Sequence, residues 1–320
     1  MKKNLLIAAI ALLAVAFVSC QKDGVYKPKQ RIAKITRSWE RTDNYFDITG
    51  TEHNDGTKAE PWVCEEWAWG DKTVESRTFT TRHATIGGIS YDPEKTTYSY
   101  DDKNRITGAQ YGDHKIEYTY NDDKKFSKIT VNDGANLEST VEINYDGKVV
   151  NSLKVTRFYP AKKCAAALAM VLPRQIVDVV CNDNEEEIVA KDARTVVTDI
   201  TLEWDGKNIV KMDAKSNDET TVTTTYEYDG KLNPYAGFYC GTGVSAEMYS
   251  KNNVIKATRT SKIAQGNATL TTETVETVEY EYDGKNPSTV KTTTVDKYDN
   301  LLGGKHTITT VTTDVYEYTK

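Results

Sequence analysis

The chain has 320 residues, of which 47 are acidic and 41 basic, and its formal net charge at pH 7 is −6. This acidic balance argues against a nucleic-acid partner, whose phosphates require a basic face, and against adsorption onto anionic lipid head groups. Only 38% of the residues are hydrophobic, and 20 of the aromatic residues are tyrosines. Tyrosine and threonine favour half-solvated strands, so the composition predicts an all-β protein.

The N-terminus has the pattern of an export signal. Lys2 and Lys3 precede an apolar run over residues 5–18, which is shorter than the ~20 residues of a membrane-spanning helix. We therefore expect a signal peptide over residues 1–19. Residues 17–20, Phe-Val-Ser-Cys, resemble the bacterial lipobox, which implies that Cys20 becomes an acylated N-terminus anchored in a membrane. The alternative is ordinary secretory cleavage beside a chance cysteine.

Residues 20–30 would then form a lipidated tether. The sequence Gln-Lys-Asp at residues 21–23 resembles the short charged export tags of Bacteroidetes surface lipoproteins. That resemblance implies a lipid-anchored protein of the outer membrane, exposed at the cell surface. Because the tag holds one acidic residue, the periplasmic face of the membrane is the alternative.

A polar stretch over residues 43–61, rich in turn-forming residues, predicts a long loop. The densest aromatic cluster of the chain follows it. Sugars stack on flat aromatic faces while carboxylates bind their hydroxyls, so a glycan platform is one interpretation of Trp62, Glu65, Glu66 and Trp67. The alternative is that Trp67 serves the structural role of the repeat described next, which leaves Trp62 as the better candidate.

One phrase recurs through the chain: an aromatic residue, a polar residue, a second aromatic residue and then a turn such as Asp-Gly-Lys. The two complete copies occupy residues 226–231 and 280–285, and two others begin with an aliphatic residue, at 143–148 and 202–207. Copies with altered turns lie at 98–103 and 118–123, weaker relatives at 67–72 and 249–253, and the chain ends on a copy without its turn.

The phrase predicts a β-hairpin. Asp-Gly supplies the positive φ values of a two-residue turn, and aromatic residues two positions apart lie on the same face of the incoming strand. We expect these aromatics to be structural pairs rather than ligand contacts. About eight such signals predict roughly 16 strands, more than the ~10 that an open sheet usually holds before it curls or closes. Residues 31–320 should therefore form a single barrel-like antiparallel meander.

The predicted strands lack the outward apolar face of a membrane pore. A spanning strand needs an apolar outer face over about 10 residues. Glu273, Glu276 and Glu279 instead place carboxylates on both faces of one strand. We therefore expect a porin-like but soluble shell held to the membrane by its lipid.

The hairpin phrase resembles the YD repeats of bacterial Rhs-type shells, and still more a family of small Bacteroidetes lipoproteins of unknown function with a porin-like fold. The early strand at residues 31–36, the Tyr-Asp-Gly-Lys turns and the final Tyr-Glu-Tyr at 316–318 carry this resemblance. It covers residues 31–320 and implies a fold, but no activity.

Residues 161–181 interrupt the β pattern. The alanine-rich segment 161–172, stopped by Pro173, predicts a short helix that is marginal alone and must dock on an apolar surface. It would plug one end of the shell or lie on its outer face. Four cysteines remain beyond the anchor, and Cys164 with Cys181 is the preferred disulfide because it would close this segment; buried free thiols are the alternative.

No motif for a zinc protease, a serine hydrolase, a phosphate loop or a calcium loop occurs. We therefore expect no catalytic residue, no metal and no cofactor. The sequence predicts a non-catalytic envelope lipoprotein that binds a glycan or a protein. An assembly factor of the outer membrane is the alternative, and a hydrolase would need two carboxylates paired by the fold.

Overall fold

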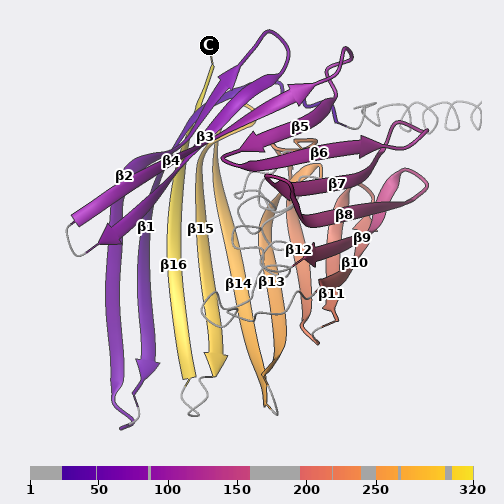
Figure 1. Ribbon diagram of the computed structural model, residues 1–320. Coiled ribbons are helices and arrows are strands. Elements are labelled where there is room, and N and C mark those ends of the chain that lie inside the picture. The colour runs from indigo at the N-terminus through magenta and orange to yellow at the C-terminus, as the bar shows by residue number, and fades with distance from the viewer. Residues whose placement is uncertain are drawn as a thin grey trace, which may run out of the picture.

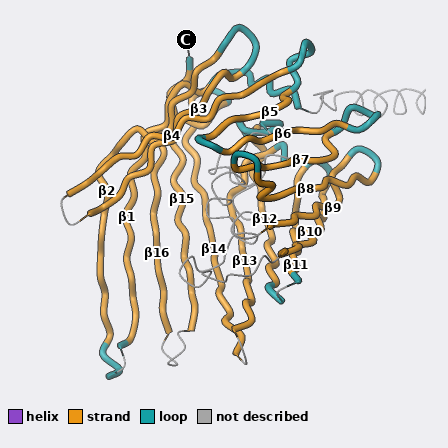
Figure 2. Tube along the Cα trace, viewed as in Figure 1, coloured by secondary structure: helices purple, strands orange, loops and turns teal. Residues whose placement is uncertain are grey.

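The structure, a computed structural model, describes residues 24–47, 49–85, 88–158, 195–217, 219–238, 250–265, 268–299 and 305–319. These residues form strands joined by turns and loops, with no helix among them (Figure 2). No helix of this described part is long and apolar enough to cross a membrane. The predicted all-β class is therefore confirmed for the described ranges, whereas the expected helical insertion at 161–181 lies outside them.

Sixteen strands are present, and most are longer than the usual five or six residues. The first nine are β1 Ile32–Phe46, β2 Glu52–Trp69, β3 Val74–Thr85, β4 Gly88–Tyr100, β5 Ile106–Tyr111, β6 His114–Tyr120, β7 Phe126–Asp133, β8 Asn136–Asp146 and β9 Val149–Phe158. The remaining seven are β10 Thr195–Asp205, β11 Asn208–Ser216, β12 Thr221–Leu232, β13 Asn252–Gln265, β14 Ala268–Asp283, β15 Asn286–Asp299 and β16 Lys305–Tyr318.

The strands form a closed antiparallel barrel in which each strand pairs with its neighbours in sequence. The last strand closes the barrel against the first, with Ile35 opposite Tyr316. Ile35 also lies opposite Glu65 of β2. The predicted meander and strand number are confirmed, and closure removes the sheet edges that an open sheet of this size would expose.

The wall of the barrel has unequal height. Strands β13 to β16, β1 and β2 have 14 to 18 residues, whereas β5 and β6 have 6 and 7. Figure 1 shows β14, β15, β16 and β1 side by side, descending well beyond the short strands β5 to β7. We call the long strands β13–β16, β1 and β2 the tall wall. Its inner face is therefore longer than that of the short strands β5 and β6.

Residues 43–61 are not the long loop that their polar composition predicted. They form the end of β1 and the start of β2, and Asp43 pairs with Asp55 in an unbroken ladder. Between the two strands, the Asp47 carboxylate accepts hydrogen bonds from the backbone N–H groups of Thr49 and Thr51 at 2.8 and 2.9 Å. Pairing with β1 outweighs the weak strand propensity of the individual residues.

The repeated phrase marks one end of the barrel, which we call the collar end, because its copies lie at the connections that follow the even-numbered strands. Three of the predicted Asp-Gly turns are confirmed: Gly147, Gly206 and Gly284 have φ values of 57°, 61° and 61°. The fourth predicted turn, at Gly230, is wrong, because β12 continues through Gly230 to Leu232. A longer loop follows there, and its buried side chains outweigh the local preference for a tight turn.

Aromatic side chains at the collar end link neighbouring strands. The ring at the end of an even-numbered strand donates a hydrogen bond to a backbone carbonyl near the start of the preceding odd-numbered strand, as Tyr100 Oη does to Val74 O at 2.8 Å. The same contact is made by Trp69 to Ile32, Tyr120 to Ile106, Trp204 to Val150, Tyr228 to Ile209, Tyr280 to Val254 and Tyr318 to Pro287. These contacts give each of these aromatics the expected structural role, which for Tyr280 does not exclude a ligand contact.

Charged residues divide between the two faces of the wall. Arg37 and Arg77 point inward, and their side chains are 19% and 8% exposed. Lys256 and Lys291 point outward, are 44% and 50% exposed, and lie beside glutamates of adjacent strands. Arginine is suited to buried bidentate ion pairs and lysine to solvated positions, so the two residue types follow the two environments.

The collar hydrogen bonds should contribute measurably to stability. Tyr100→Phe removes the bond to Val74 O and leaves that carbonyl without this donor, so we expect a loss of ~1 kcal/mol in the free energy of unfolding. Urea denaturation followed by circular dichroism measures it. Tyr91→Phe, on a tyrosine that is 48% exposed, is the control. Equal stability of the two variants would contradict the structural role of the collar.

Candidate functional site

A loop folds into the collar end from inside the barrel. After β12, residues 233–238 place Tyr235 and Phe238 in the interior, 3% and 1% exposed. The Phe238 ring lies 4.9 Å from Trp67 and 4.8 Å from Tyr26, measured between ring centroids. Tyr26 Oη donates a hydrogen bond to Pro234 O at 2.6 Å. The loop and these rings fill the collar end, which we infer to be blocked.

Tyr26 belongs to the segment that was expected to be a tether. It is 8% exposed and stacks on Trp69 at 5.9 Å, so the folded domain includes residues before 31. The expected signal peptide at 1–19 and the acylation site Cys20 lie outside the described residues.

A small, half-open pocket with a cavity volume of about 50 Å³ lies between this loop and the inner face of β13–β16. This volume is well below the ~300–1,000 Å³ of sites that enclose a whole small molecule, so the pocket can receive only the end of a larger ligand. Apolar side chains of the wall form part of the lining. The polar and aromatic residues of the lining include Tyr235, Asn253, Glu276, Tyr280, Asp314 and Tyr316.

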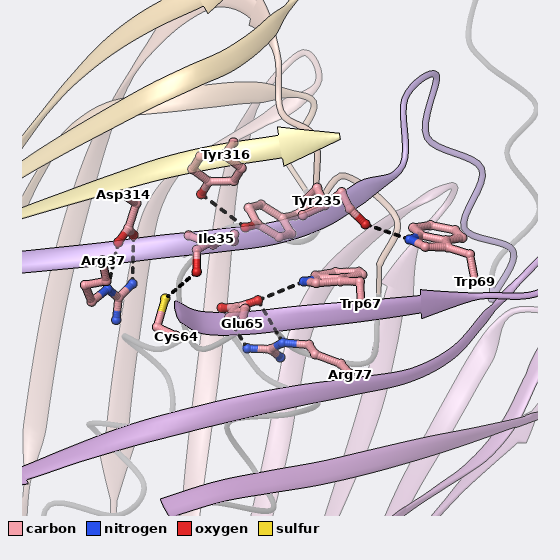
Figure 3. A network of polar contacts seen from close by, with 11 residues as sticks. Ile35, Arg37, Cys64, Glu65, Trp67, Trp69, Arg77, Tyr235, Asp314 and Tyr316 are labelled. Carbon is pink, nitrogen blue, oxygen red and sulfur yellow. Dashed lines mark hydrogen bonds and ion pairs between the residues drawn. The ribbon is translucent and has the colours of Figure 1, made fainter. Parts of the chain in front are cut away.

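One carboxylate of the pocket is neutralised by the wall itself. Asp314 on β16 lies opposite Arg37 on β1 and accepts two hydrogen bonds from it, Nε to Oδ1 and Nη2 to Oδ2, both at 2.7 Å (Figure 3). Asp314 is 4% exposed. A bidentate pair of this kind fixes the orientation of both side chains. This side of the pocket is therefore polar without carrying net charge.

Two tyrosines form the inner end of the pocket. Tyr235 Oη donates a hydrogen bond to Tyr316 Oη at 3.1 Å (Figure 3). Burial raises the pKa of each hydroxyl well above its ordinary value. Both groups are therefore neutral at physiological pH, where each can donate or accept a hydrogen bond without introducing charge.

The predicted platform residues lie on different surfaces. Glu65 and Trp67 face the interior and are 0% and 6% exposed. Arg77 on β3 donates to Glu65 through Nε at 2.9 Å and Nη2 at 3.0 Å, and Trp67 Nε1 donates to the same carboxylate at 3.0 Å (Figure 3). Glu66 is exposed and lies on the opposite face of β2. These three side chains therefore do not form one glycan platform.

Trp62 stands where the wall forks. Beyond Phe79, β3 pairs only with β4 and leaves β2, and in Figure 1 the hairpin of β3 and β4 leans away from the barrel. Trp62 Nε1 donates to Thr80 O across this fork at 3.0 Å. Its indole therefore joins the diverging strands, in addition to any role in binding.

Cys64 is a buried free thiol and donates to Ile35 O at 3.5 Å. Burial raises the pKa of this thiol to about 12, so it is protonated and unreactive at physiological pH. The predicted pair Cys164 and Cys181 lies outside the described residues. Within the part of the chain that is described, no group of three or more His, Cys, Asp or Glu side chains is placed to hold a metal ion.

Sequence reasoning missed the residues that line the pocket. Asp314, Tyr316 and Glu276 occur in strands that were recognised, but their inward direction depends on the register of the closed barrel. The Asn-Pro at residues 233–234 was an available signal, because it marks an irregular loop directly after a phrase whose turn would otherwise be short.

Comparison with known proteins adds little to this geometry. No protein-family model matches the sequence, and no curated protein matches it. Among solved structures, the chain is similar to a porin-like protein from Bacteroides uniformis at 10% sequence identity and a TM-score of 0.45; the match covers 92% of this chain and 100% of that one. The strand pairing defines the fold.

Changing only one partner of the Glu65–Arg77 pair should strongly destabilise the fold. Arg77→Met leaves a carboxylate buried with one indole donor, so the free energy of unfolding should fall by ~3–5 kcal/mol. Glu65→Gln combined with Arg77→Met should restore a large part of this loss. Denaturant unfolding of the two variants measures the difference; a double variant no more stable than Arg77→Met would refute the interpretation.

Proposed function

We propose that this protein is a non-catalytic binding protein of the bacterial envelope and that its barrel holds carbohydrate in the pocket at the collar end. The observation that carries the proposal is the lining of the pocket, where tyrosine rings, an amide and carboxylates converge on one space. Aromatic faces suit the apolar faces of sugar rings. Precisely placed polar groups beside them bind hydroxyls and fix orientation.

The charge arrangement favours a neutral ligand. Asp314 is paired with Arg37 within the pocket wall, and nearby Glu65 is paired with Arg77. A strongly charged ligand would have to separate such pairs or leave its own charge without a partner in a partly buried space. A neutral polyhydroxyl compound needs only hydrogen bonds and ring contacts, which this lining supplies.

The envelope location rests on the predicted export signal and on acylation of Cys20, with the outer membrane as the anchoring bilayer and the cell surface as the expected side.

The charges on the outer wall support a barrel that faces water. Lys211 lies 3.3 Å from Glu203, and Lys256 lies 2.9 Å from Glu227, on outward-facing positions. A wall against hydrocarbon would have to desolvate these charges, at a cost of several kcal/mol.

A glycan array with the acylation-free protein tests the ligand class. Glu276→Gln keeps the size of a pocket side chain and removes its charge, so affinity for a ligand found on the array should fall about tenfold or more, the effect of weakening a charge-assisted hydrogen bond. Isothermal titration calorimetry measures this change.

Glu279→Gln is the matched control, because Glu279 lies on the outer face of the same strand, 3.8 Å from Lys291. Its affinity should equal that of the unmodified protein. If no glycan binds on the array, the carbohydrate proposal is contradicted, and the alternative of an assembly factor, tested by recovery of a stable protein partner, takes its place.

The water-facing wall has its own test. The chain from residue 20 onward with Cys20→Ala should stay dissolved and β-structured in buffer without detergent. Size-exclusion chromatography and circular dichroism measure both properties. Precipitation that detergent prevents would indicate that the barrel itself inserts into a bilayer.

A further inference from the structure

We propose that the ligand is an extended carbohydrate chain whose end enters the pocket, and that the rim of the tall wall, its end far from the collar, carries a second subsite for the same chain. This inference rests on the proposed function. The second subsite is a row of four rings, Tyr298, His306, Tyr45 and His53, which we call the rim row.

The rim row is built by strand register. Tyr298 on β15 lies opposite His306 on β16, His306 lies opposite Tyr45 on β1, and Tyr45 lies opposite His53 on β2. The rings therefore share one face of four adjacent strands. Successive ring centroids are 4.6, 5.5 and 4.9 Å apart. The result is a continuous aromatic surface near the ends of the longest hairpins.

The rim row lies on the same face as the pocket. His306 and Asp314 are eight residues apart on β16, and even-numbered residues of this strand face inward, as the buried Asp314 and Tyr316 show. At ~3.4 Å per residue, the two sites are ~27 Å apart along the wall. Thr310 and Thr312 on β16 lie between them, opposite Thr294 and Thr292 on β15. Hydroxyl groups thus line the path from rim to pocket.

Carboxylates accompany the rings. One step along the strands toward the pocket, Asp296, Asp43 and Asp55 occupy the same inner face. Tyr45 Oη donates to Asp55 Oδ2 at 3.3 Å, and Asp43 accepts from Arg41 Nε at 2.9 Å. Rings beside fixed carboxylates repeat the chemistry of the pocket: stacking surfaces with acceptors for hydroxyls.

His306 leaves a hydrogen-bonding atom unused at the centre of the row. Its Nε2 has no hydrogen-bond partner among the described residues and is shielded from solvent. His53 differs, because its Nε2 lies 3.0 Å from Asp47 Oδ2. Buried polar atoms are nearly always satisfied in folded proteins, so this atom would gain a partner if the imidazole turned toward a ligand hydroxyl or a water.

The direction of binding follows from the two ends of the path. The rim lies at the free end of the tall wall (Figure 1), whereas the buried Tyr235 and Phe238 lie at the collar end, which we infer they block. A chain that follows the wall from the rim must therefore stop in the pocket. The site should recognise a chain terminus rather than an internal segment.

Stabilisation of the hairpin ends by cross-strand aromatic pairs is the competing explanation for the rim row. It predicts an effect of these rings on stability alone. The subsite predicts that the rings affect affinity for long ligands and not for short ones. A change in stability alone would not depend on ligand length.

The experiment uses ladders of maltose, chitin and mannan oligosaccharides, from single sugars to lengths that span the wall, with binding measured by calorimetry. Affinity should rise with length until the rim is reached. Tyr45→Ala and Tyr298→Ala should each weaken binding of the longest oligosaccharides about tenfold and leave that of the shortest ones unchanged. Unchanged binding of short ligands by the same variants shows that they are folded.

Three comparisons complete the design. Tyr91→Ala, on the exposed hairpin of β3 and β4, is the matched control and should bind every length as the unmodified protein does. His306→Phe keeps a ring in the row and removes Nε2, so its loss should be smaller than that of Tyr45→Ala. A bulky dye on one terminus of the oligosaccharide should abolish binding, whereas the same dye on the other terminus should not.

The outcomes separate the two proposals. If no member of any ladder binds, the carbohydrate function itself is overturned. If short and long oligosaccharides bind equally well, or if the rim variants bind long ones normally, the pocket stands and the rim subsite is overturned. If binding stays intact with the dye on one terminus and also with the dye on the other, recognition of a chain end is overturned.

Discussion

A hydrogen bond from an aromatic side chain to a backbone carbonyl links one strand to the next around the collar end. Tyr100 reaches Val74 in this way, Trp69 reaches Ile32, and five further pairs repeat the contact. The rings also fill the end of a barrel that is too wide for ordinary wall residues to pack across. With this end held and filled, the long strands can extend away from it as a wall. The pocket and the rim row both lie on the surface that this arrangement leaves available.

The division of charges explains how a wall so rich in polar residues encloses a site. Inward arginines such as Arg37 and Arg77 form bidentate pairs with carboxylates, so these parts of the interior have hydrogen-bonding capacity without net charge. Outward lysines remain solvated beside glutamates. This distribution is the basis of our proposal that the barrel meets water outside and holds a neutral polar ligand inside. The hairpin of β3 and β4 departs from this pattern, because it exposes the hydrophobic side chains of Ile89 and Tyr91.

Much of the fold could be predicted because its rules are local. An Asp-Gly between alternating strands determines a turn wherever the neighbouring structure permits it, and Gly206 and Gly284 behave accordingly. Gly230 departs from the rule because the loop beyond it buries Tyr235 and Phe238 in the collar, a contact distant in sequence. For the same reason residues 43–61 were misjudged, since only pairing with β1 makes them strands.

The pocket could not be predicted at all. Its side chains come from a loop and four strands, and their convergence depends on closure of the whole barrel.

The central claim is that sugar binds on the inner face of the tall wall with its terminus in the pocket at the collar end. A crystal structure of the protein with an oligosaccharide that it binds tests this claim most directly. The account predicts a terminal sugar ring between Tyr280 and Tyr316, within hydrogen-bond distance of Glu276, and the rest of the chain directed along β15 and β16 toward the rim. Sugar density on the outer wall or at the β3–β4 hairpin, with none in the pocket, would contradict it.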